Sequence, residues 1–288
     1  MDDCLRIAVQ KKGRLQERSC DLIQGCGIDF DRNNGRLRTR ARDFPLELLF
    51  LRDDDIPGYV ADRVADAGIV GKNEIDEKGV DVRIVRDLGF ARCRLSLAIP
   101  KKEEYRGLEG LEGRSIATSY PSILRTCLEE RGVRADIHRL SGSVEIAPEV
   151  GLTDCIFDIV SSGETLSRNG LKEAETLYRS SAVCIANRGL CPGKENILQR
   201  LLLRIDSVLR ARSYKYILLN APNTALADIT ELIPGMKSPT VTSLAEKGWS
   251  SLQSVVREDE FWEVIEKLKD LGARGILVVP IEKMIHGE

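Results

Sequence analysis

The sequence predicts an α/β protein of two lobes, followed by a smaller C-terminal domain of βαββαβ order. Three observations support this prediction. Short apolar runs alternate with helical patterns as far as about residue 210, and the order of strands and helices changes after that point. The chain has 288 residues, of which 42% are hydrophobic. That content is enough for two or three cores, at roughly 100–200 residues per domain.

The first lobe is expected over residues 1–95, completed by about 182–210. Strands alternate with helices there, which favours a mainly parallel sheet covered by helices. The runs that predict these elements lie at 5–9, 15–26, 46–51, 56–65 and 67–70. A further strand is expected at 182–186, and residues 194–212 carry apolar side chains at helical spacing.

The second lobe is expected over residues 96–181 and is also α/β. Its predicted elements are strands at 96–100, 115–118 and 155–160 and a helix at 122–131. No low-complexity linker separates the lobes, so we expect the chain to cross between them more than once. Two lobes joined in this way enclose a cleft, which is where ligands bind.

The C-terminal domain is expected over residues 211–288. Its predicted elements are a strand at 214–220, a helix at 224–233, strands at 240–244 and 252–257, a helix at 259–271 and a strand at 275–279. This is the order of ferredoxin-like folds. A small appended domain of this type is more often regulatory or oligomeric than catalytic, although a fold alone proves neither.

Composition excludes several classes of function. With 43 basic and 45 acidic residues and a net charge of −2, the chain has no charge excess for nucleic acid. No apolar run approaches the ~20 residues that span a bilayer, so no membrane segment is expected. The acidic first residues differ from the start of a secretory signal, and the cytoplasm is the expected location.

Histidine and cysteine are too scarce or too scattered for two common chemistries. The chain has two histidines, His138 and His286, and its eight cysteines form no Cys-x-x-Cys pair. A zinc site and a Ser-His-Asp triad are both disfavoured. We therefore look for a reaction that needs neither a histidine nor a protein nucleophile.

The segment at 151–166 is the most informative one. An apolar strand that contains Asp154 and Asp158 runs into a loop formed by Ser161, Ser162, Gly163, Glu164 and Thr165. Backbone N–H groups and hydroxyls of such a loop can converge on a phosphate, and the upstream carboxylates suit the paired hydroxyls of a ribose. The alternative is an ordinary strand-turn-helix connection in which Ser and Thr cap the next helix.

Further motifs follow one another along the whole chain. They are Lys12-Gly13-Arg14-Leu15, Asp55-Ile56-Pro57 with Ala67-Gly68-Ile69-Val70-Gly71, Arg114 through Ala117-Thr118-Ser119-Tyr120-Pro121, Glu145-Ile146-Ala147-Pro148, Asp154 to Leu166, Asn169-Gly170-Leu171, and Pro234-Gly235-Met236-Lys237-Ser238-Pro239-Thr240-Val241. With them the chain resembles, over essentially its full length, the long form of the ATP phosphoribosyltransferase family. Two departures, Lys11 in place of a frequent proline and Ser162 in place of the usual threonine, are chemically mild.

The resemblance implies the first reaction of histidine biosynthesis. N1 of the ATP adenine attacks the anomeric carbon of phosphoribosyl pyrophosphate, and pyrophosphate leaves with the help of Mg²⁺, which is held mainly through the substrate. Such a reaction needs positioning and electrostatics rather than a protein nucleophile. The resemblance also implies lobes of the periplasmic-binding-protein type, feedback inhibition by histidine, and homo-oligomers, namely dimers and hexamers.

Site residues are carried over by position. The resemblance assigns Lys12 and Arg14 to the polyphosphates, Asp154 and Asp158 to the ribose, Ser161 to Thr165 to the 5′-phosphate, Glu145 to the ribose or magnesium, and Arg14, Gly71 and Tyr120 to ATP. Each assignment has a plainer alternative. Lys12 and Arg14 would otherwise lie in a solvated loop, Asp158 would be a buried structural acid, Tyr120 a packing residue and Glu145 a helix cap.

The resemblance assigns histidine binding to the C-terminal domain. The residues are Asn220, Met236, Ser238 and Thr240, and the alternative is a simple Pro-Gly turn between a helix and a strand. Two rival functions remain for the whole chain. A two-lobed protein that binds small anions without catalysis is disfavoured by the missing secretory signal and by the loop at 154–165. A catalytically silent regulatory paralogue is disfavoured because that loop is intact.

Overall fold

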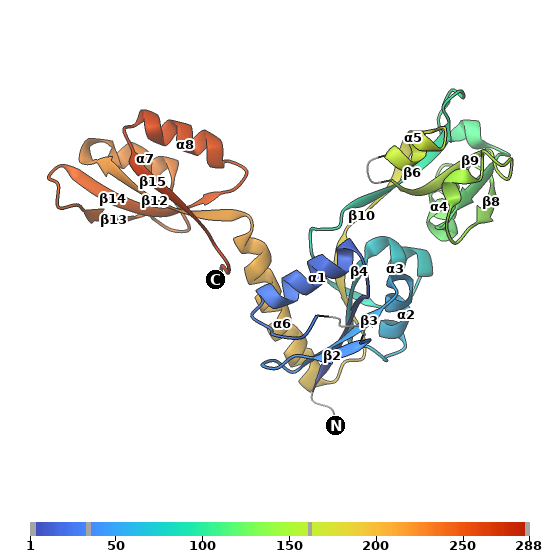
Figure 1. Cartoon of the computed structure of the whole chain (residues 1–288), viewed down its shortest axis with the longest axis horizontal. Helices are drawn as coiled ribbons and strands as arrows, with labels where there is room; N and C mark the ends of the chain where they lie inside the picture. The colour runs from blue at the N-terminus through green and yellow to red at the C-terminus, as the bar shows by residue number, and fades with distance from the viewer. Residues whose placement is uncertain (1–3, 33–35, 161–162, 286–288) are drawn as a thin grey trace. The chain divides into compact units, whose positions relative to one another are not determined.

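The residues that the structure describes form three β-sheets (Figure 1). The structure is a computed structural model that describes residues 4–32, 36–160 and 163–285. By compactness the chain divides into two units, one made of the residues up to Asp21 with Asp29–Ile197, the other of Leu22–Ile28 with the chain from Leu198 onward. The first unit contains two of the sheets and the second contains the third.

The first sheet has the strand order β2-β3-β1-β4-β11-β5. Its strands are β1 (Leu5–Gln10), β2 (Arg38–Arg40), β3 (Leu46–Leu51), β4 (Ala67–Gly71), β5 (Arg83–Asp87) and β11 (Ala182–Ala186). Strands β3, β1 and β4 are parallel, but β2, β11 and β5 pair antiparallel with their neighbours. The expected mainly parallel sheet is therefore mixed, because β11 enters from the other sheet and its direction is not fixed by a strand-helix-strand crossover.

Three helices accompany this sheet: α1 (Arg14–Gly25), α2 (Ile56–Ala61) and α3 (Lys72–Lys78). Gly68 on β4 permits a close approach of α2, because a Cβ atom at this position would lie 2.7 Å from Cγ2 of Ile56 and 3.2 Å from Cγ2 of Val60. Both side chains are fully buried in the core of this lobe. This contact gives the glycine of the 67–71 motif a packing reason.

The second sheet has the order β10-β6-β9-β7-β8. Its elements are β6 (Cys93–Pro100), β7 (Ser115–Thr118), α4 (Pro121–Glu129), β8 (Asp136–Arg139), β9 (Cys155–Val160), α5 (Glu164–Arg168) and β10 (Leu171–Ser180). Strands β8, β7 and β9 are parallel, whereas β6 and β10 are antiparallel additions. This sheet is mixed as well.

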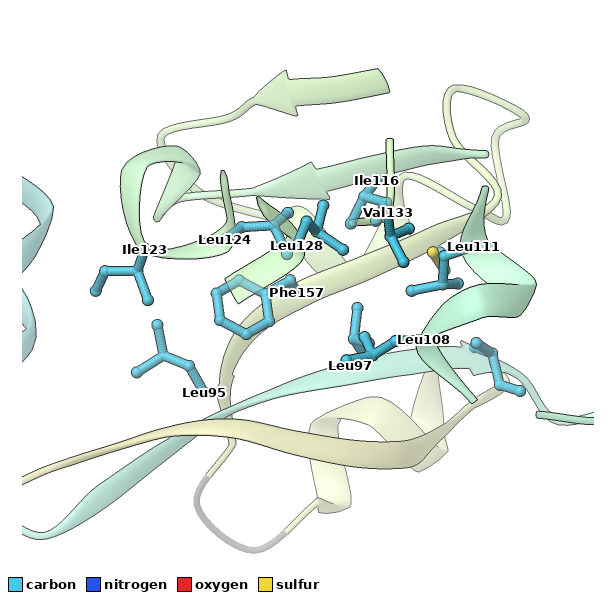
Figure 2. Close-up of a cluster of buried hydrophobic side chains, with 12 residues drawn as sticks. Leu95, Leu97, Leu108, Leu111, Ile116, Ile123, Leu124, Leu128, Val133 and Phe157 are labelled. Atoms are coloured by element: carbon cyan, nitrogen blue, oxygen red, sulfur yellow. The ribbon is translucent and has the colours of Figure 1, made fainter. Parts of the chain in front are cut away.

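Phe157 of β9 lies at the centre of the core of the second sheet. Figure 2 shows its ring between Leu124 and Leu128 of α4 on one side and Leu95 and Leu97 of β6 on the other. All five side chains are almost completely buried. Burial of aliphatic and aromatic surface on this scale fixes β9, and with it the loop that follows the strand.

The chain crosses between the two sheets twice, as predicted. One crossing joins β5 to β6 and the other joins β10 to β11. The first crossing contains Gly89 and Ala91 at φ values of +69° and +49°. A left-handed alanine is uncommon and marks a sharp local change of chain direction.

The C-terminal sheet has the order β13-β14-β12-β15, and its pairings are all antiparallel. Its elements are β12 (Tyr214–Pro222), α7 (Leu226–Leu232), β13 (Thr240–Ser243), β14 (Trp249–Arg257), α8 (Phe261–Asp270) and β15 (Arg274–Pro280). The predicted βαββαβ order is confirmed, and both helices cover the same face of the sheet (Figure 1). The long predicted helix forms α6 (Pro192–Ala211) and leads into this domain. Over the described ranges, none of the helices has the length and apolar character needed to cross a bilayer.

Candidate active site

A cavity of about 790 Å³ lies in the first unit, where polar residues follow the ends of β1 and β4. Parallel strands end at one edge of a sheet, which brings the residues after them together. Its lining includes Gln10, Arg14, Arg18, Asp53, Gly71, Asn73, Glu74, Arg92, Tyr120 and Ile159. All three residues predicted to bind ATP, namely Arg14, Gly71 and Tyr120, are among them. Its volume is within the range of small-molecule sites. We call it the larger cavity.

Gly71 and Asn73 form a fixed corner of the larger cavity. A Cβ atom at position 71 would lie 2.4 Å from Oδ1 of Asn73, so a side chain there would displace the amide. The backbone N–H of Asn73 donates to Oγ of Ser180 at 3.0 Å, and that hydroxyl donates to Oδ1 of Asn73 at 2.8 Å. The hydroxyl of Ser180 thus holds both the backbone N–H and the side-chain oxygen of Asn73.

Glu74 is the buried carboxyl group of the larger cavity, with 8% of its surface exposed. Its Oε1 accepts hydrogen bonds from Nδ2 of Asn73 at 2.8 Å and from the Tyr120 hydroxyl at 3.1 Å. Burial, with the nearby negative charge of Asp53, raises the pKa of Glu74 to about 7. The sequence analysis did not find Asn73 or Glu74; polar residues directly after the buried strand 67–70 were the available signal.

Tyr120 lies immediately before helix α4, and its hydroxyl reaches across to α3. Burial and the carboxyl group of Glu74 raise the pKa of Tyr120 well above its usual range, so the phenol stays protonated and remains a donor. Its backbone N–H donates to Oγ1 of Thr118 at 2.8 Å. The ring is therefore held at the lining of the larger cavity by contacts at both ends.

A second cavity, of about 240 Å³, lies beside the end of β9. We call it the smaller cavity. Its lining contains four of the residues predicted to bind phosphoribosyl pyrophosphate, namely Glu145, Asp158, Gly163 and Thr165. Ile159 lines both cavities, so the two adjoin. The predicted loop residues Ser161 and Ser162 lie outside the described residues.

The polar groups of the smaller cavity are poised for a ligand. Gly163 has a φ of +76° and precedes α5 directly, which is a conformation that glycine adopts without strain. Burial first, and then the negative charge of Glu145, raise the pKa of Asp158. Two carboxyl groups that line one cavity favour a partner with hydroxyl donors or a cation.

Asp154 is not part of either cavity. It directly precedes β9, and four residue-to-residue steps along the extended strand separate it from Asp158 by roughly 13 Å. One carboxylate oxygen of Asp154 accepts hydrogen bonds from the backbone N–H and the hydroxyl of Ser115, each at 2.8 Å. These bonds lower the pKa of Asp154. The geometry gives this residue a role in joining β9 to β7.

Two further predicted residues lie apart from the lining. Lys12 is exposed in the bend between β1 and α1. Glu164 is exposed and pairs with Arg168 one turn along α5, at 2.6 Å. Neither Lys12 nor Glu164 is therefore among the residues that line the two cavities.

Two of the residues predicted to bind histidine, Asn220 and Thr240, lie on opposite sides of one strand. Thr240 pairs with Gln253 on β14, and Asn220 of β12 pairs with Ser251 on the same strand. Strand β14 thus lies between them, and two strand spacings amount to roughly 10 Å. Met236 and Ser238 are exposed on the connection before β13.

A metal ion would need ligands beyond the protein. Within the described part of the chain, no group of three or more His, Cys, Asp or Glu side chains is arranged to hold one. Glu145 and Asp158 are hard oxygen donors of the kind that Mg²⁺ prefers, but its six-coordinate shell would have to be completed by substrate oxygens and water.

The fold and the two adjoining cavities define an α/β protein with room for a nucleotide-sized ligand next to a smaller polar one. Comparison with known proteins gives the particular family. The model of the family described as ATP phosphoribosyltransferase matches residues 52–207, and the model of the C-terminal domain of HisG matches residues 211–283. The chain belongs to the ATP phosphoribosyltransferase family and is a pentosyl-transferring enzyme.

Relatives match over nearly the whole chain. The ATP phosphoribosyltransferase of Parabacteroides distasonis is 58% identical over 98% of this chain and 99% of its own. That of Cytophaga hutchinsonii is 56% identical over 99% of this chain and 100% of its own. Among solved structures, the ATP phosphoribosyl transferase (HisG:HisZ) complex from Thermotoga maritima is similar with a TM-score of 0.58 at 28% identity, over 70% of this chain and 98% of that chain.

Proposed function

We propose that this chain joins ATP to phosphoribosyl pyrophosphate in the first step of histidine biosynthesis. The observation that supports this most directly is the pair of adjoining cavities. Residues predicted for ATP line the larger one, residues predicted for phosphoribosyl pyrophosphate line the smaller one, and Ile159 borders both. A transfer between two bound substrates requires this adjacency.

The larger cavity suits ATP. Arg14, Arg18 and Arg92 are among its lining residues, and guanidinium groups match phosphate oxygens by charge-assisted hydrogen bonds. Tyr120 offers an aromatic face for adenine. The larger cavity thus offers arginines for the triphosphate and an aromatic ring for the base.

The smaller cavity suits the phosphoribosyl group. The backbone around Gly163 and the hydroxyl of Thr165 can donate to the 5′-phosphate, and the carboxyl groups of Glu145 and Asp158 can accept from the ribose hydroxyls. Mg²⁺, when bound to the diphosphate, neutralises the charge of the leaving group.

The reaction requires no covalent attachment to the protein. The lone pair of adenine N1 forms the new bond to C1′ of the ribose, and the electron pair of the C1′–O bond leaves with pyrophosphate. Positive charge that develops on the ribose is shared by the ring oxygen and faces the two carboxyl groups. Positioning and electrostatic stabilisation are the contributions of this chain.

Release of pyrophosphate from ATP and phosphoribosyl pyrophosphate tests this function. Thr165→Ala should lower kcat/KM at least about tenfold, because a hydrogen bond to a charged group is worth about 1.5–3 kcal/mol. Thr126→Ala is the matched control, since Thr126 is exposed on α4 and its hydroxyl donates to the carbonyl of Ser122, outside both cavities. Binding of both substrates without turnover would instead favour the small-anion-binding alternative.

Regulation and assembly are part of the same proposal. The match of residues 211–283 to the C-terminal domain of HisG supports a sensor for histidine in this domain and action of the chain as a homo-oligomer, dimeric or hexameric. Mg²⁺ dependence and a cytoplasmic location remain predictions of the sequence. Size measurement in solution with and without histidine tests the assembly.

A further inference from the structure

Glu74 is the buried acid of the larger cavity to which the assignments above give no role. It lies on α3, three residues beyond Gly71, and 8% of its surface is exposed. Burying a carboxyl group to this extent is unfavourable unless partners satisfy it. We therefore ask which of its two oxygens already accepts hydrogen bonds from the protein, because the other oxygen is the one that can bind a ligand.

The two oxygens of Glu74 differ in their surroundings. Both hydrogen bonds from the protein, from Asn73 and from Tyr120, end on Oε1. Oε2 accepts none of the bonds in the described part of the chain, where Nε of Arg83 is the one side-chain polar atom both buried and unpartnered. Oε2 is thus not sealed in the core, and it belongs to a residue of the cavity lining.

The reaction creates a cationic partner for a free carboxylate oxygen. When adenine N1 bonds to C1′, positive charge spreads over N1, C6 and N6 of the ring. The N6–H group then becomes a stronger donor than it is in free ATP. A carboxylate that accepts from N6–H stabilises the transition state more than the bound substrate, which is the condition for catalysis.

Resting on the proposed function, we propose that Oε2 of Glu74 accepts a hydrogen bond from N6–H of the ATP adenine and stabilises the charge that develops on the ring. The N1–C1′ bond forms with the N1 lone pair, the C1′–O electron pair leaves with pyrophosphate, and both N6 protons stay on nitrogen. Glu74 is then a catalytic residue that also selects a purine with a 6-amino group.

The contact with Tyr120 supports this placement. Its hydroxyl is 3.1 Å from Oε1 of Glu74, so the aromatic ring and the carboxyl group are held in one fixed relation. A base stacked on the ring would therefore lie beside the carboxyl group, since both residues line the same cavity. Because the pKa of Glu74 is raised to about 7, its carboxyl group is only partly ionised in the empty enzyme at neutral pH. A hydrogen bond from N6–H favours the ionised form.

The test compares Glu74→Gln with the wild-type chain. Glutamine keeps an oxygen that can accept from Asn73 and Tyr120, but it puts an NH₂ group in place of Oε2 and removes the charge. We expect kcat for ATP to fall about 10²-fold, the size seen when one preorganised transition-state hydrogen bond is removed. We expect the dissociation constant of purine riboside 5′-triphosphate, which lacks the 6-amino group, to change less than about twofold.

Glu129→Gln, at the exposed end of α4 and outside the cavity lining, is the matched control and should retain wild-type kcat. Wild-type kcat in Glu74→Gln overturns the proposal. Equal losses for ATP turnover and for binding of the analogue overturn it too, because they mean that Glu74 only holds Tyr120 in place. Failure of the proposed function is distinguishable, since the wild-type chain itself would then release no pyrophosphate.

Discussion

Three carboxyl groups in the first unit show how the environment of a residue decides its role. Glu74 and Asp158 are desolvated, which raises the pKa of each, whereas two hydrogen bonds from Ser115 lower the pKa of Asp154. Raised values are typical of acids that await a ligand, and lowered values are typical of structural acids. The sequence placed Asp154 and Asp158 in one motif, but only Asp158 lines a cavity.

Glu74 should destabilise the fold at neutral and higher pH. Its pKa of about 7 lies above its ordinary value of 4.5, so between these values the unfolded chain ionises and the folded chain does not. The free energy of unfolding therefore falls by at most about 3 kcal/mol as pH rises from about 4.5 to 7, and it does not recover above pH 7. Relative to wild type, Glu74→Gln should gain stability at pH 8 but not at pH 4.5. Denaturant unfolding at both pH values measures this, and an equal difference at both would contradict the assigned environment.

Asp154 and Asp158 should respond to substitution in opposite ways. Asp154→Ala removes two hydrogen bonds to Ser115 and should lower the free energy of unfolding by about 1 kcal/mol while KM for phosphoribosyl pyrophosphate stays unchanged. This contribution is present above pH 3.8 and is lost as pH falls through the lowered pKa. Asp158→Asn should lower kcat/KM at least about tenfold with little loss of stability. Steady-state kinetics and denaturant unfolding on the same preparations measure both effects. A raised KM for phosphoribosyl pyrophosphate in Asp154→Ala would show that Asp154 contacts the substrate.

At the scale of elements, apolar runs were predicted and polar strands were missed. Strands β1, β3 and β4 are nearly continuous apolar stretches because they are buried on both faces. Strand β10 (Leu171–Ser180) carries charged residues and two register irregularities against β6, so it has no regular alternation. An edge strand of this kind is fixed by pairing with β6, which the local sequence does not show.

Helix α4 is capped by a residue of another helix. Tyr120 at its N-cap position makes no side-chain capping bond, and instead the carboxylate of Glu77 on α3 accepts from the backbone N–H groups of Ser122 at 3.0 Å and Ile123 at 3.1 Å. A carboxylate at this place also matches the helix dipole. No local pattern predicts a cap that comes from a residue 45 positions away.

Removal of this cap should loosen the start of α4. Glu77→Ala is expected to lower the free energy of unfolding by about 1 kcal/mol, the usual worth of a cap, and to speed amide exchange at residues 122 and 123. Hydrogen exchange with mass spectrometry measures the second effect. Glu129→Ala, at the exposed far end of the same helix, is the control. Unchanged exchange in Glu77→Ala would show that the contact contributes nothing to the helix.

At the scale of the whole molecule, the order of elements was predictable and the order of strands was not. The change from an alternating α/β pattern to βαββαβ near residue 211 identified the C-terminal fold before any contact was known. Strand order in a sheet depends on tertiary pairing, and here it inserts β14 between Asn220 and Thr240. The same limit hid Glu74, because its partner Tyr120 belongs to the other lobe. The domain boundaries at 95, 181 and 210 stay predictions.

Histidine inhibition, as proposed, should depend on the C-terminal domain and not on the cavities. The core of that domain is formed by its own strands and helices, with Ile217, Leu252 and Leu268 fully buried, and none of its residues lines either cavity. Histidine bound there can act only through different affinities for two states of the enzyme. Histidine and phosphoribosyl pyrophosphate should therefore bind the enzyme at the same time, which equilibrium binding of histidine at saturating phosphoribosyl pyrophosphate measures.

Exposed hydroxyls at Ser238 and Thr240 lie on the connection to β13 and at its first residue, where they are accessible to a zwitterionic ligand. The double variant Ser238→Ala with Thr240→Ala should raise the histidine concentration for half inhibition at least about tenfold, the effect of losing about 1.4 kcal/mol of binding. Activity without histidine should stay at the wild-type level, since neither residue is among those that line the two cavities. Thr242→Ala, on the same exposed strand, is the matched control. Inhibition of the double variant at the wild-type concentration would place the sensor elsewhere, because neither hydroxyl would then contact the effector.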